Sequence, residues 1–96
     1  MSLFVVQHKH TAETCPAGNP QMGAALVQHV SPEHASKFGV NVRADAVVDG
    51  QHTFVLIVEA ADDDIVRDFM TPFYQAGTVE IMPASSCEQV VERAKC

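Results

Sequence analysis

Two histidines, His8 and His10, stand two residues apart near the start of the chain, and Cys15 follows them in sequence. The residues before them are mostly β-branched or aromatic and predict a strand over residues 3–10, so both imidazoles point to the same face of a sheet. Their Cα atoms then lie about 6.5–7 Å apart, and two imidazoles at that separation can bind one metal ion. With the Cys15 thiolate they form a candidate set of nitrogen and sulfur ligands for zinc, copper or nickel. Three protein ligands leave a position open for water or substrate.

These residues also have other interpretations. His8 and His10 can be solvated or hydrogen-bonded residues at a strand end, or general bases, because histidine titrates near neutrality. Cys15 can be a small buried apolar residue, as free cysteine commonly is, or a reactive thiol. The spacing leaves these alternatives open.

Cysteine usage and composition narrow the class of protein. The chain has three cysteines and no Cys-x-x-Cys pair, which argues against a disulfide framework or a zinc ribbon. Six Lys and Arg residues stand against twelve Asp and Glu residues, giving a net charge of −6. This acidic balance argues against nucleic acid and anionic membranes as partners. With 96 residues, 47% of them apolar, we expect a single folded domain over residues 1–96.

The N-terminal residues lack the basic start, the apolar stretch and the cleavage site of a secretory signal. The longest apolar run, residues 54–58, is too short to span a bilayer. We therefore expect a cytoplasmic protein with reduced thiols.

Hydrophobic periodicity predicts the strands that position these residues. Alternation and β-branched runs indicate strands over 3–10, 40–48, 53–60 and 78–82. Val40, Val42, Ala44, Ala46 and Val48 are expected to share one face of their strand, and Asp49-Gly50 predicts a hairpin after it. The nearly continuous apolar run from Thr53 to Ala60 predicts a strand that is buried on both faces.

Capping signals predict the helices. Asn19 followed by Pro20 begins a helix that runs to about Val30, and Ser31-Pro32 begins a short one. Asp62-Asp63-Asp64 caps a second main helix, which Pro72 kinks or ends. Ser85-Ser86-Cys87-Glu88 is a capping box for a terminal helix.

The resulting order is β-α-β-β-α-β with an extra C-terminal helix, which predicts an α+β domain of the ferredoxin-like kind with an antiparallel sheet. The strand over 3–10 should then lie between the strands over 53–60 and 78–82. Both main helices should cover one face of the sheet and leave several apolar residues exposed on the other. A monomer rarely exposes so large an apolar patch, so we expect a homodimer.

This topology gathers further side chains around the first strand. Because neighbouring strands run antiparallel, the end of 3–10 lies where 53–60 and 78–82 begin. His52 and Glu80 should therefore lie at this edge, as should Tyr74 at the end of the second helix, and His52 is a possible fourth metal ligand. His29 and His34 are expected at the opposite edge, where the first helix ends.

The strand and helix order resembles the stand-alone dimeric α/β-barrel proteins, which include muconolactone isomerases, small monooxygenases and small metal-binding members. Phe69-Met70-Thr71-Pro72-Phe73-Tyr74 followed by Val79-Glu80-Ile81-Met82 is similar to the way isomerase-like members end their second helix and enter their fourth strand. The resemblance covers roughly residues 3–83 at the level of topology and implies a dimeric barrel. No catalytic motif of those enzymes matches residue by residue, so no catalytic residue carries over.

Three hypotheses for function follow. The first is a small homodimeric protein that binds a transition metal through His8, His10 and Cys15, with His52 as a further ligand. The second is a small dimeric enzyme of the isomerase or monooxygenase type, in which His8 or His10 is the general base for a small organic substrate, assisted by Tyr74 or Glu80. The third is a non-catalytic interaction module.

Overall fold

The computed structural model describes all residues from Met1 to Cys96 and confirms an α+β fold. Four antiparallel strands form one sheet in the order β2-β3-β1-β4, which is the ferredoxin-like order. The strands are β1 (Ser2–His10), β2 (Asn41–Val48), β3 (Thr53–Ala60) and β4 (Gly77–Ala84). As expected, β1 lies between β3 and β4.

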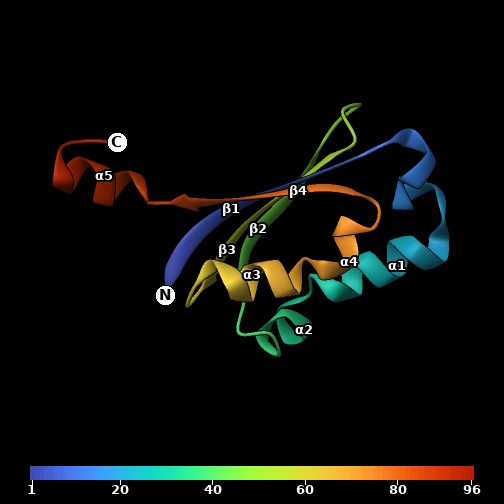
Figure 1. Cartoon of the computed structure of the whole chain (residues 1–96), viewed down its shortest axis with the longest axis horizontal. Helices are drawn as coiled ribbons and strands as arrows, with labels where there is room; N and C mark the ends of the chain where they lie inside the picture. The colour runs from blue at the N-terminus through green and yellow to red at the C-terminus, as the bar shows by residue number, and fades with distance from the viewer.

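Most of the helices lie on one side of this sheet, as Figure 1 shows for α1 to α4. They are α1 (Pro20–His29), α2 (Pro32–Ser36), α3 (Asp63–Phe69) and α4 (Thr71–Tyr74). Two 3₁₀ turns, η1 (Ala12–Thr14) and η2 (Pro16–Gly18), connect β1 to α1. The last helix, α5 (Cys87–Arg93), lies apart from the others beyond the end of β4 (Figure 1). None of these helices combines the length and the apolar character that a membrane crossing requires.

The predicted capping residues begin the helices. The Asn19 side chain accepts hydrogen bonds from the Gln21 and Met22 amides, and the Asp62 side chain accepts one from the Ile65 amide. Pro72 does not lie within the second main helix. The helix α3 ends at Phe69, and Pro72 lies in the first turn of α4, where proline loses no hydrogen bond.

The capping box of α5 begins one residue later than the sequence predicts. Ser86 and Gln89 form it, in place of Ser85 and Glu88. Glutamine serves as well as glutamate at this position, because its side-chain oxygen accepts a hydrogen bond from the capping residue's amide.

The hydrophobic core lies between the sheet and the helices. Leu56 and Val58 of β3 are fully buried there, as are Val66 and Phe69 of α3. On the other face of the same strand, Ile57 remains 37% exposed. The prediction that β3 is buried on both faces is therefore wrong for this chain alone, since no element covers its second face (Figure 1).

The strand β2 departs from the expected alternation. Its register against β3 shifts between Val42 and Ala44, because an extra residue bulges out of the strand there. Beyond the shift, Val47 lies opposite Phe54 and shares its face. The prediction that Val42 and Val48 lie on one face is therefore wrong, and the bulge turns Val47 toward the helices.

Candidate metal site and adjoining cavity

Three of the predicted residues come together at one end of the sheet. The candidate ligand atoms of His10, Cys15 and His52 all lie within 4.8 Å of one another, and all three residues are half-buried. They come from the end of β1, the junction between η1 and η2, and the turn that leads into β3. We refer to His10, Cys15 and His52 as the His-Cys cluster.

Main-chain pairing holds the two histidines of the cluster together. The His10 amide donates a hydrogen bond to the His52 carbonyl oxygen at 3.1 Å, which extends the β1–β3 ladder by one bond. Their ring centroids lie 5.3 Å apart, nearly edge to face. His52 has a φ of +48°, a left-handed conformation that non-glycine residues adopt infrequently. The tight turn before β3 therefore directs the His52 side chain toward His10.

Local hydrogen bonds fix the backbone around Cys15. Thr11 and Thr14 form a capping box around η1, and the Cys15 amide donates to the Ala12 carbonyl oxygen. The Thr14 hydroxyl donates to the Ala76 carbonyl oxygen at 3.0 Å and so ties the loop to the start of β4. These contacts hold Cys15 beside the end of β1.

His10 has an unusual environment for a polar side chain. Both of its ring nitrogens are buried and have no hydrogen-bond partner in the protein. Buried polar atoms nearly always have partners, because an unpaired one costs about 1–3 kcal/mol. Burial lowers the pKa of His10 below its ordinary value, and the neighbouring His52 lowers it further. The neutral imidazole that results has a free lone pair, as a metal ligand requires.

His8 lies beside the cluster but is not part of it. The side chain is only 3% exposed, and its Nδ1–H donates to the Thr78 carbonyl oxygen at 3.1 Å. The ring stacks on His10 with centroids 5.2 Å apart and meets Phe73 edge to face at 5.1 Å. The pKa of His8 is lowered, mainly by burial. The hydrogen bond to Thr78 acts to raise this pKa, and the charge of His10 acts to lower it. His8 therefore packs against His10 as a neutral, hydrogen-bonded residue.

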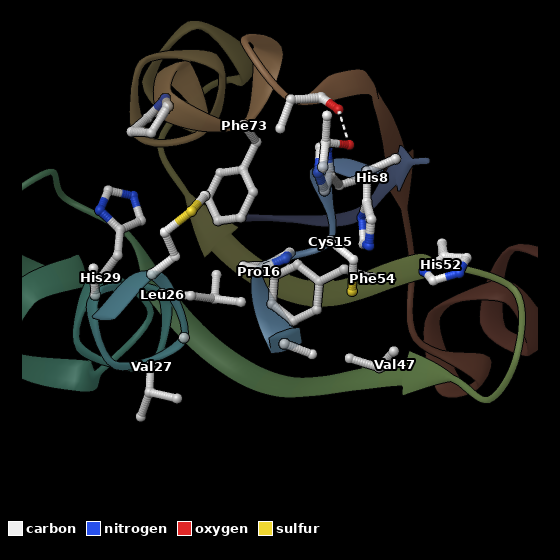
Figure 2. Close-up of a pocket in the computed structure, with 18 of the residues that line it drawn as sticks. His8, Cys15, Pro16, Leu26, Val27, His29, Val47, His52, Phe54 and Phe73 are labelled. Carbon is white, nitrogen blue, oxygen red and sulfur yellow. Dashed lines mark hydrogen bonds between the residues drawn. The ribbon is translucent and has the colours of Figure 1, made fainter. Parts of the chain in front are cut away.

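A cavity of about 730 Å³ opens beside the cluster, between the sheet and α1. Figure 2 shows His8, Cys15 and His52 on one side of this cavity, and Leu26, Val27 and His29 on the other. Phe54 and Phe73 lie between the two groups. The cavity thus has a nitrogen- and sulfur-bearing end and an apolar body.

His29 lines this cavity, which corrects the expectation that it lies at the opposite edge of the sheet. The reason is length: a ten-residue helix advances about 15 Å, whereas a nine-residue strand advances about 30 Å. The helix α1 therefore ends only part of the way along the sheet. His29 Nε2–H donates to the Phe69 carbonyl oxygen at 2.7 Å, and the His29 ring stacks on Phe69.

Glu80 and Tyr74 do not join the site. Glu80 lies opposite Gln7 in the β1–β4 ladder, so it occupies the sheet face away from His8 and His10. Tyr74 is 43% exposed and does not line the cavity. Both predictions took no account of the face of the sheet or helix on which these residues lie.

A second group of possible ligands, Asp62, Asp63 and Asp64, lies at the start of α3. All three are exposed, and the Asp62 side chain caps α3. Asp63 and Asp64 pair with Arg67 one turn further along. These contacts stabilise the start of α3.

Comparison with known proteins assigns no family to this chain. No protein-family model matches the chain. No curated protein matches it either.

Proposed function

We propose that this protein binds one transition-metal ion through His10, Cys15 and His52. The observation that supports this proposal is that His10 has two buried ring nitrogens without partners, next to a thiol and a second imidazole. A metal ion would take up one of these nitrogens and bind the thiolate and the second imidazole at the same time.

The spacing of the cluster suits such an ion. In a tetrahedral zinc site, bonds of about 2.0 Å to nitrogen and 2.3 Å to sulfur separate the ligand atoms by about 3.3–3.5 Å. The ligand atoms of the cluster lie within 4.8 Å of one another, and small side-chain rotations would close the difference. Two imidazoles and one thiolate suit zinc, copper or nickel, and they leave a coordination position open.

His8 has a supporting role in this proposal. Its Nδ1–H is already bonded to Thr78, and its ring stacks on His10. Such contacts fix the orientation of a ligand ring, as the groups that surround metal ligands commonly do.

The test is to measure bound metal in protein purified without a histidine tag and loaded with zinc. We expect one zinc ion per chain. Cys15→Ala should weaken zinc binding on the order of 100-fold or more, because it removes the only charged ligand. Cys87→Ala is the matched control, since Cys87 is exposed and lies far along the chain in α5.

Two results would contradict the proposal. One is unchanged zinc stoichiometry in the double variant His8→Ala/His10→Ala, with the fold verified by circular dichroism. The other is an equal loss of zinc affinity in Cys15→Ala and Cys87→Ala, which would indicate nonspecific thiol binding.

A second candidate function is supported by the apolar cavity beside His8 and His10. In this alternative the protein is an enzyme that acts on a small organic molecule without a metal, and a neutral imidazole is the general base. The cavity, the burial and the lowered pKa values of both histidines favour it. Neither Tyr74 nor Glu80 can assist, because neither reaches the cavity. If this protein binds no zinc but requires His10 for catalytic turnover, the result would support this second function over metal binding.

We also propose that the protein forms a homodimer through the uncovered face of the sheet. This face presents half-buried or exposed apolar side chains from three adjacent strands: Leu3, Val5, Val55, Ile57 and Met82. A second copy of the chain offers a matching apolar surface, because the same face would pack on itself about a twofold axis.

A further inference from the structure

The cavity beside the His-Cys cluster has the size of a small-molecule site. Its volume of about 730 Å³ lies within the range of about 300–1,000 Å³ typical of such sites. Eleven of the 21 residues that line it are hydrophobic. The proposed metal site alone does not account for this volume, since an ion with three protein ligands needs only a small fraction of it.

Aromatic and aliphatic side chains form the body of the cavity. The rings of Phe54 and Phe73 lie 5.8 Å apart and only 21° from parallel. Leu26 and Met22 of α1 both line the cavity. Figure 2 shows Leu26 on the helix side of the cavity and Val47 of β2 on the sheet side. Such surfaces favour a flat, apolar molecule, whose burial would contribute about 25 cal/mol per Å².

The charges around the cavity limit the polar groups that a ligand can carry. No Lys or Arg lines it, and Asp49 is the only lining residue that carries a formal charge when histidine and cysteine are neutral. Phosphate groups and other multiply charged anions need cationic side chains or a cluster of amides. The side chains that line the cavity therefore offer no cationic partner to the phosphate of a nucleotide or sugar phosphate.

The remaining polar end is the His-Cys cluster, where the proposed metal ion keeps an open coordination position. An oxygen or sulfur donor on the ligand can fill that position while the rest of the molecule lies against Leu26, Phe54 and Phe73. We infer that the cavity binds a small aromatic molecule bearing one oxygen or sulfur donor, which coordinates the metal ion held by His10, Cys15 and His52. This inference rests on the proposed function and adds the chemical class of the ligand.

The inference can be tested with two fluorescent probes, 2-naphthol and naphthalene. Both fit an apolar cavity, but only 2-naphthol carries a donor oxygen. Zinc-loaded protein should bind 2-naphthol at least tenfold more tightly than protein stripped with a chelator. Naphthalene should bind equally well to both forms. In cobalt-substituted protein, 2-naphthol should also change the visible spectrum, because a new ligand enters the coordination sphere.

Two neighbouring alanines of α1 provide matched variants. Ala24 and Ala25 are both exposed, but only Ala25 lines the cavity. Ala25→Phe should place a benzyl group in the cavity and weaken binding of both probes at least tenfold. Ala24→Phe should leave binding of both unchanged, and both variants should still bind one zinc ion per chain.

The outcomes separate this inference from the proposed function. A protein that binds one zinc ion, but binds 2-naphthol no better with zinc than without it, overturns the inference and leaves the metal site intact. Equal losses in Ala24→Phe and Ala25→Phe also overturn it. Failure to bind zinc at all overturns the proposed function, and the metal content reports that failure directly, without either probe.

Discussion

His10 and His52 each carry an unfavourable feature. The ring nitrogens of His10 are buried without partners, and the backbone of His52 adopts a left-handed conformation with a φ of +48°. Each feature lowers the free energy of unfolding. The His10 nitrogens lose their hydration without gaining a partner, and the Cβ atom of His52 is crowded against the backbone. Binding of a metal ion would offset these free-energy costs. The ion would bond to one ring nitrogen of His10 and to the ring of His52, which the left-handed backbone directs toward His10. Local strain of this kind is concentrated at functional sites.

Replacing His52 should therefore separate stability from metal binding. We expect His52→Gly to raise the free energy of unfolding of the metal-free protein by about 0.5–1 kcal/mol, because glycine adopts a positive φ without crowding. The same variant should lose zinc affinity. His52→Ala is the control: it also loses zinc affinity but keeps the crowded Cβ and gains no stability. Urea unfolding after chelator treatment measures the difference, and equal stability of the two variants would argue against strain at His52.

At the scale of elements, the site depends on the close pairing of β1 with its neighbours. The β1–β4 ladder pairs His10 with Gly77, and a Cβ atom at Gly77 would collide with the Lys9 carbonyl oxygen. The start of β4 can approach the end of β1 this closely only because residue 77 has no side chain. The same approach brings the Ala76 carbonyl within reach of the Thr14 hydroxyl, which holds the loop that carries Cys15.

Gly77→Ala should accordingly destabilise the protein by about 2 kcal/mol or more, because the backbone of β4 must move away from Lys9. Gly18→Ala is the matched control, since nothing lies within 4 Å of a Cβ atom placed there. Chemical denaturation of both variants measures the effect. A loss of stability in Gly77→Ala no greater than in Gly18→Ala would show that β4 can shift at little cost.

At the scale of the whole molecule, the sheet has two unequal faces. One is covered by α1 to α4 and contains the core and the cavity, while the other has no covering element (Figure 1). Ile57 lies near the middle of the uncovered face and pairs with Val5 of β1. The cavity opens on the covered side, so a dimer formed through the uncovered face would leave the His-Cys cluster of each copy accessible.

A charge placed on the uncovered face tests this assembly. We expect the protein to sediment as a dimer and Ile57→Lys to sediment as a monomer, because a buried lysine without a partner would oppose the interface. Tyr74→Lys is the control: Tyr74 is exposed to a similar degree but lies on the helix side, so this variant should remain dimeric. Wild-type protein that sediments as a monomer at micromolar concentration would contradict the dimer.

Local sequence patterns specify the order of the elements, the helix starts at Asn19 and Asp62, and the shared face of His8 and His10. Capping and strand alternation are local interactions, so a few neighbouring residues suffice to specify them. Strand topology also predicts that His52 lies near His10 and Cys15, and the ligand atoms of these three residues do lie within 4.8 Å of one another. Long-range packing, in contrast, specifies that His8 is bonded to Thr78 and that His29 reaches the cavity. These last two placements depend on the register of the β1–β4 ladder and on the length of α1 relative to the strands. They are contacts between segments far apart in sequence, and no local pattern specifies them.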